Sequence, residues 1–141
     1  MCGISGIISL HSQKPVDPIV LDRMTDSIKH RGPNDRGTFI NRDVGLGALR
    51  LSIIDLANGH QPISNENESM WIVFNGEIYN YIALRDLVLK KGHTLKTKCD
   101  TEVILHLYEE FGADCLQYFS GMFAFAIWDD RKKELFVARD R

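Results

Sequence analysis

The segment that decides the fold opens the chain and reads Met1-Cys2-Gly3-Ile4-Ser5-Gly6-Ile7-Ile8-Ser9-Leu10. The apolar run after Cys2 predicts a buried strand, which would hold Cys2 in place. If Met1 is removed, Cys2 carries both a thiol and an α-amino group with a pKa of about 8. Such a residue combines a nucleophile and a base without a histidine or aspartate elsewhere. A reduced, half-buried cysteine at the start of a strand is the plainer interpretation.

Helix and strand signals alternate in the segments that follow. Asp17-Pro18 predicts the start of a helix that ends near residue 29, because an aspartate N-cap precedes a proline at the first helical position. Residues 38–41 and 44–51 predict two short strands, and residues 55–70 predict a loop. Residues 71–74 predict a strand that ends in a turn at Asn75-Gly76.

The second half of the chain continues this mixture. Asn80 is expected to cap a helix over residues 81–91, and residues 94–97 predict a strand. Asp100 or Thr101 is expected to cap a further helix that Gly112 closes. Residues 122–139 predict a hairpin that turns near residue 131. Hairpin-like strand pairs mixed with helices favour an α+β fold over a parallel α/β sheet.

Composition limits the function classes. The chain has 141 residues, which predicts one domain, and its formal net charge of −2 gives no electrostatic basis for binding nucleic acid or an anionic membrane. No apolar run approaches the roughly 20 residues of a membrane span. The three cysteines lie far apart in the sequence, which fits a reducing cytoplasm and argues against a disulfide framework or a Cys-rich zinc site.

The histidines give no sign of a metal site. Their spacing does not match that of metal ligands, and lone histidines are more often structural or exposed. They are His11, His30, His60, His93 and His106. The sequence therefore predicts no metal and no other cofactor in this chain.

Three further positions carry chemistry that can be read in two ways. Arg50 ends an apolar strand, where it can grip a carboxylate in a bidentate manner or form a surface ion pair. Asn75 and the backbone N–H of Gly76 can converge on one oxygen as an oxyanion site, or form a simple hairpin turn. Asp100 can hold an ammonium group, or cap a helix.

Taken together, six segments in this order resemble the class II glutamine amidotransferase domain, an N-terminal-nucleophile hydrolase, and most of all the glutaminase domain of asparagine synthetases. They are Met1-Cys2-Gly3-Ile4, His30-Arg31-Gly32-Pro33, Arg50-Leu51-Ser52-Ile53-Ile54-Asp55, Asn75-Gly76-Glu77-Ile78-Tyr79-Asn80, Asp100-Thr101-Glu102 and Gly121-Met122-Phe123-Ala124-Phe125-Ala126. The first loop departs from the family pattern, because Asn34 stands where the family usually has Asp.

The resemblance implies a four-layer αββα sandwich with largely antiparallel sheets. It also implies that Cys2 attacks the side-chain amide of glutamine, while Asn75 and Gly76 bind the oxyanion. Arg50 would hold the α-carboxylate, and Asp100 with Glu77 the α-ammonium. The backbone from Leu51 through Ile53 and Ile54 would line the pocket.

The resemblance also bears on partners. Family domains continue past Arg141 into a synthetase domain that uses ATP and Mg²⁺, and this chain has no phosphate loop, so residues 1–141 are expected to be a C-terminally truncated glutaminase domain. The expected partners are glutamine and that synthetase domain, with a homodimer left open. Two alternatives are an amidotransferase of the same class that feeds another acceptor, such as a sugar, and a non-catalytic domain that binds glutamine.

Overall fold

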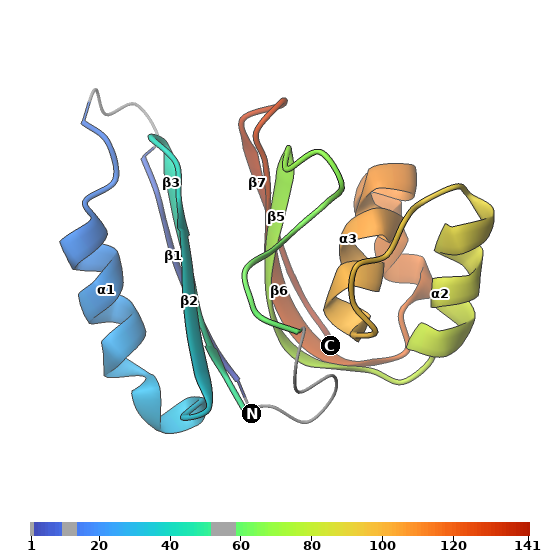
Figure 1. Ribbon diagram of the computed structural model, residues 1–141, viewed down its shortest axis with the longest axis horizontal. Helices are drawn as coiled ribbons and strands as arrows, with labels where there is room; N and C mark the ends of the chain where they lie inside the picture. The colour runs from blue at the N-terminus through green and yellow to red at the C-terminus, as the bar shows by residue number, and fades with distance from the viewer. Residues whose placement is uncertain (1, 10–13, 52–58) are drawn as a thin grey trace.

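The computed structural model describes residues 2–9, 14–51 and 59–141 (Figure 1). None of the helices in these ranges is long and apolar enough to cross a membrane. The α-helices are α1 (Pro18–Ser27), α2 (Tyr81–Lys90) and α3 (Asp100–Phe111), and the short 3₁₀ helices are η1 (Lys29–Arg31) and η2 (Gly112–Tyr118). The strands are β1 (Gly3–Ile8), β2 (Asp35–Ile40), β3 (Val44–Arg50), β4 (Ile63–Ser64), β5 (Met70–Ile78), β6 (Gly121–Asp129) and β7 (Glu134–Arg139).

The described strands form two sheets, and every pairing in them is antiparallel. One sheet has the order β1-β3-β2 and the other β4-β5-β6-β7. The sheets face each other, with α1 against the outer face of the first and α3 against the outer face of the second, while α2 packs on α3 (Figure 1). The result is a helix–sheet–sheet–helix arrangement, so the expected α+β class with antiparallel sheets is confirmed.

The buried hydrophobic residues of the described ranges form two main clusters. Between the sheets, Val44 and Leu46 of β3 pack with Val73 of β5 and Trp128 of β6. A larger cluster lies between the second sheet and α3, where Phe125 is among the fully buried side chains. All seven residues of β3 are buried, as expected for a central strand that lies between α1 and the second sheet.

The structure can be compared with the caps predicted for the three α-helices. The side chain of Asp17 accepts a hydrogen bond from the backbone N–H of Ile19 at 2.9 Å, so the predicted cap of α1 is confirmed. Asn80 holds the N-cap position of α2 as expected, but its side chain makes no capping hydrogen bond and instead bonds to the backbone of Tyr118 and Ser120. The expected cap of α3 is wrong, since Cys99 holds the cap position.

Two further expectations about strands are corrected. Residues 94–97 form no strand, because the backbone N–H of Thr97 and its neighbour Lys96 are bound by the carboxylate of Glu102 and not by another strand. The predicted loop over residues 55–70 contains the short strand β4, and its residues 55–58 lie outside the described part. The strand predicted after Cys2 is present as β1, but it is only half-buried, with Gly3 its one buried residue.

The predicted turn at Asn75-Gly76 is wrong, and this difference shapes the site. Strand β5 continues through both residues to Ile78, and Gly76 pairs with Phe123 of β6. Gly76 has a φ of 152°, and a Cβ on it would lie 2.2 Å from the carbonyl oxygen of Met122. The glycine therefore allows the close approach of β6 and does not mark a chain reversal.

Gly76→Ala is expected to cost more than about 3 kcal/mol of unfolding free energy, because it adds both backbone strain and a steric overlap with β6. Gly92→Ala is the matched control, since Gly92 also has a positive φ, of 98°, but a Cβ there meets nothing within 4 Å. Strain alone predicts a loss of about 1–2 kcal/mol for the control. Urea unfolding of both variants measures the difference, and equal losses would contradict the steric argument.

Candidate active site

A cavity of about 120 Å³ collects the residues that the sequence singled out. It lies where β1 and β3 of one sheet meet β5 of the other and the start of α3. The predicted site residues that line it are Cys2, Arg50, Leu51, Asn75, Gly76, Glu77 and Asp100. Ile53 and Ile54 lie outside the described residues.

Backbone contacts hold Cys2 at one wall of this cavity. The N–H of Leu51 lies 3.4 Å from the Cys2 sulfur, and the thiol can donate to the carbonyl of Leu51 at 3.8 Å. Arg31 donates from Nε to the carbonyl oxygen of Cys2 at 3.1 Å. Leu51 contacts the sulfur of Cys2 and Arg31 binds its backbone carbonyl, so these two contacts fix the position of the thiol.

The sequence predicted no role for Arg31. It belongs to the segment His30-Arg31-Gly32-Pro33, which contributed to the family resemblance without a role. Gly32 lets this segment reach β3, since a Cβ on it would lie 2.4 Å from the carbonyl of Leu49. The loop thus comes close enough to β3 for Arg31 to bind the Cys2 backbone.

Arg50 is buried, which excludes the plainer interpretation as a surface ion pair. It is the last residue of β3 and is 6% exposed. Its guanidinium lies against Gly59, where a Cβ would come within 2.4 Å of a guanidinium nitrogen. An arginine placed in this way offers a fixed, planar set of donors at the cavity wall, as recognition of a carboxylate requires.

Asp100 occupies the first position of α3 and is bound to the end of β5. Its Oδ2 accepts a hydrogen bond from the N–H of Ile78 at 3.0 Å. Burial raises the pKa of Asp100, the N–H of Ile78 lowers it, and the nearby charge of Glu77 raises it, so the pKa lies above its usual value. A cation bound beside this carboxylate would offset the cost of burying its charge.

Asn75 presents a polar atom that the described residues leave unsatisfied. Its side-chain oxygen is buried and has no hydrogen-bond partner among them. Buried polar atoms are normally paired, so an unpaired amide in a cavity wall is the kind of group that a ligand satisfies. The side-chain oxygen and nitrogen are exchangeable by rotation, so the amide can offer either an acceptor or a donor.

Gln61 completes the wall behind Asn75 and was not identified from the sequence. Its Oε1 accepts a hydrogen bond from the backbone N–H of Phe74 at 2.7 Å, and its Nε2 lies 3.5 Å from the hydroxyl of Thr101. Gln61 therefore ties β5 to α3 and also lines the cavity. No local pattern around Gln61 signals this role, since it depends on two segments distant in sequence.

All 141 residues match the family model of the glutamine amidotransferase domain, so the chain belongs to that family, in its class II branch. Within the family it is homologous to the N-terminal domains of asparagine synthetases.

The relatives are much longer than this chain, which aligns with only part of each. The chain is 45% identical over 142 residues to asparagine synthetase (glutamine-hydrolyzing) 1 of Bacillus subtilis, covering 99% of this chain and 22% of that protein. It is 38% identical over 140 residues to asparagine synthetase (glutamine-hydrolyzing) 1 of Arabidopsis thaliana, covering 99% and 24%. The chain thus spans about a quarter of the length of these relatives.

Solved structures support the fold. A glutamine phosphoribosylpyrophosphate amidotransferase from B. subtilis matches with a TM-score of 0.56 at 24% identity, over 72% of this chain and 24% of that chain. A structure described as the allosteric regulatory enzyme of purine biosynthesis matches with a TM-score of 0.57 at 26% identity, with the same coverage.

Proposed function

We propose that this chain hydrolyses the side-chain amide of glutamine to glutamate and ammonia. The observation that carries the proposal is the cavity that brings the Cys2 thiol together with Arg50, Asn75 and Asp100. Glutamine is a zwitterion with a terminal amide, and this set supplies a cation, an anion, a nucleophile and an amide donor. Such complementarity fits an N-terminal-nucleophile hydrolase.

In the proposed reaction, Cys2 is the first residue of the mature chain. Its α-amine, acting through a water molecule, takes the thiol proton while the sulfur attacks the amide carbon. The side chain of Asn75 and the N–H of Gly76 bind the oxyanion of the tetrahedral intermediate. The C–N bond then breaks, ammonia leaves with a proton returned by the amine, and a thioester remains on Cys2.

The second half of the reaction restores the enzyme. Water, activated by the same α-amine, attacks the thioester carbon, and the Cys2 sulfur leaves as glutamate forms. Throughout, Arg50 holds the α-carboxylate, and Asp100 with Glu77 holds the α-ammonium. The sum is glutamine plus water giving glutamate plus ammonia, with no oxidant or reductant.

We further propose that the ammonia serves a synthetase domain that makes asparagine from aspartate and ATP. The homology to asparagine synthetases supports this acceptor over a sugar. ATP and Mg²⁺ belong to that synthetase domain in this proposal, and no step in residues 1–141 uses them. Glutamine hydrolysis by this chain should therefore need neither ATP nor aspartate, which an assay of glutamate release tests directly.

The mechanism requires a free α-amine on Cys2, so removal of Met1 is expected. Intact-mass spectrometry of the purified protein should show the loss of one methionine residue. A chain that keeps Met1 and still hydrolyses glutamine would contradict the proposed base. A variant with one alanine inserted after Met1 is the control. It keeps the thiol, but the nitrogen of Cys2 is then part of a peptide bond and cannot act as a base, so the variant should be inactive.

A further inference from the structure

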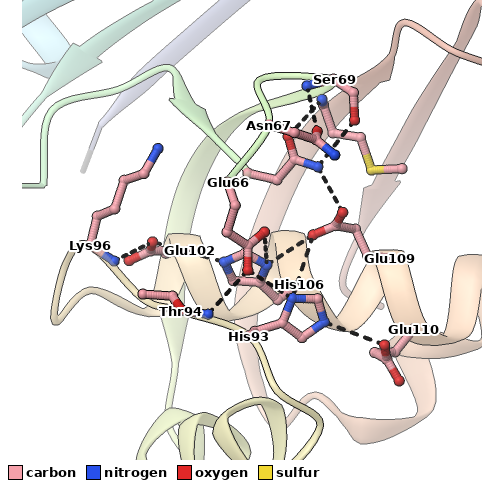
Figure 2. A network of polar contacts seen from close by, with 12 residues as sticks. Glu66, Asn67, Ser69, His93, Thr94, Lys96, Glu102, His106, Glu109 and Glu110 are labelled. Atoms are coloured by element: carbon pink, nitrogen blue, oxygen red, sulfur yellow. Dashed lines mark hydrogen bonds and ion pairs between the residues drawn. The ribbon is translucent and has the colours of Figure 1, made fainter.

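Figure 2 shows a second cluster of polar side chains, and none of its labelled residues lines the cavity at Cys2. Among the described residues, one group of histidines and carboxylates brings its potential ligand atoms within 4.8 Å of one another. His106 and Glu109 come from α3, His93 from the segment between α2 and α3, and Glu66 from the turn between β4 and β5. Three segments distant in sequence thus converge on one point.

The distances among these atoms match a four-ligand cage. His93 Nδ1 lies 3.0 Å from Glu66 Oε1, and His106 Nδ1 lies 2.9 Å from Glu109 Oε2. The two cross distances are 3.9 Å from His93 Nδ1 to Glu109 Oε2 and 3.6 Å from His106 Nδ1 to Glu66 Oε2. Tetrahedral ligands with metal bonds of about 2.0 Å are about 3.3 Å apart, so small shifts would close the cage around an ion.

The far nitrogen of each imidazole faces a further carboxylate. Nε2 of His106 lies 3.8 Å from Glu102, and Nε2 of His93 lies 3.4 Å from Glu110. Neither nitrogen has a hydrogen-bond partner within normal geometry. A metal on Nδ1 would place the ring proton on Nε2, pointing at these carboxylates, which is the usual outer arrangement of histidine ligands.

The carboxylate ligands are oriented as well. Glu109 accepts a hydrogen bond from Asn65 Nδ2 on Oε1 at 2.7 Å, which leaves Oε2 facing the histidines. Glu66 accepts the backbone N–H of Thr94 on Oε1 at 3.1 Å. Both acidic side chains are therefore held in place by neighbours as well as by the imidazoles (Figure 2).

Burial and charge favour a cation at this point. The side chain of His106 is 1% exposed, whereas that of Glu66 is 37% exposed and leaves a route from solvent. Three carboxylates surround the imidazole of His106, with Glu109 at 2.9 Å, Glu66 at 3.6 Å and Glu102 at 3.8 Å. Lys91 is paired with Glu110, at 3.2 Å from Nζ to Oε2.

We propose that Glu66, His93, His106 and Glu109 bind one divalent late-transition-metal cation, with Zn²⁺ the best match. Two neutral imidazoles and two carboxylates balance the charge of the ion, and imidazole nitrogen favours Zn²⁺ over Mg²⁺ or Ca²⁺. Four protein ligands leave no open position, so the site is structural and not catalytic. The ion would fasten the β4–β5 turn and the segment before α3 to α3, the helix that begins with Asp100.

The test is metal binding by the purified protein after treatment with a chelator. A Cys2→Ala background removes the accessible thiol, while Cys99 and Cys115 are buried and burial raises the pKa of both thiols. Zn²⁺ should bind at one ion per chain and raise the Tm by at least about 5 °C at a hundredfold excess over the Kd. Mg²⁺ at millimolar concentration should leave the Tm unchanged.

Variants separate this site from other histidines. Glu66→Gln and His93→Gln should each weaken Zn²⁺ binding by roughly tenfold or more. The side chain of Glu66 is 37% exposed and that of His93 is 14% exposed, so Glu66→Gln is the variant that disturbs packing less. His60→Gln is the matched control, because it removes an exposed His–Asp pair with Asp35 and should bind Zn²⁺ like the parent. Equal Zn²⁺ affinity in Glu66→Gln and the parent, or no Zn²⁺ bound by the parent, would overturn the proposal. The cluster would then be a network of hydrogen bonds and ion pairs without a metal.

Discussion

Cys2→Ala is expected to lower glutamine hydrolysis by at least about 10⁴-fold. The reason is that no other thiol can replace Cys2. Cys99 also lines the cavity, but burial raises the pKa of its thiol, so little thiolate is present at neutral pH. Glutamate release measured with and without Cys2→Ala tests this. The variant should keep the Tm of the parent, because Cys2 is only half-buried and packs no core.

Cys2→Ser provides a matched control for the shape of the site. It keeps the α-amine and a hydroxyl in place of the thiol, so glutamine should still bind while turnover falls sharply. Isothermal titration with glutamine measures binding separately from chemistry. Hydrolysis that persists in Cys2→Ala would remove Cys2 as nucleophile, and glutamine binding without any hydrolysis in the parent chain would favour the non-catalytic alternative.

Asn75→Ala is expected to lower kcat by about 10²–10³, with a smaller effect on KM. The amide of Asn75 is assigned to an oxyanion that exists only in the transition state, so its loss affects the rate more than ground-state binding. Arg50→Ala is expected to do the reverse and raise KM more than it lowers kcat. Its proposed partner, the α-carboxylate, keeps its charge throughout the reaction. Steady-state kinetics on both variants measure the split.

Asn80→Ala is the matched control for the loss of an asparagine. Its side chain bonds to Tyr118 and Ser120, outside the cavity, so both kinetic constants should stay near those of the parent. If Asn75→Ala and Arg50→Ala changed kcat alone and by similar factors, the separate roles of oxyanion donor and carboxylate anchor would be wrong.

The sequence predicted the residues of the cavity better than the path of the chain through it. Cys2, Arg50 and Asp100 were named from short segments, and the structure brings them together because β1 and α3 begin where β3 ends. The predicted helix from Asp17-Pro18 also formed, since a cap and a proline are local signals. A local signal of this kind holds where no contact with a distant segment competes with it.

Features that depend on tertiary contacts were missed. Asn75-Gly76 has the composition of a turn, but pairing with β6 overrides that preference and keeps β5 extended. His93 and His106 are 13 positions apart and follow no ligand spacing, yet the packing of the segment before α3 brings their rings together in a tilted contact with centroids 4.5 Å apart. Neither outcome can be read from neighbouring residues, because each is decided by a segment elsewhere in the chain.

Because β1 pairs with β3 in a fixed register, the number of residues before Gly3 decides where the thiol lies in the site. Gly3 lies opposite Leu49, so the ladder places Cys2 beside Arg50. Adding one residue between the terminus and Gly3 would turn the thiol to the opposite face, and adding two would carry it about 7 Å along the strand. A cleavable leader that ends immediately before Cys2 would therefore act as an off-switch, and its removal would release full activity without any change in the folded domain.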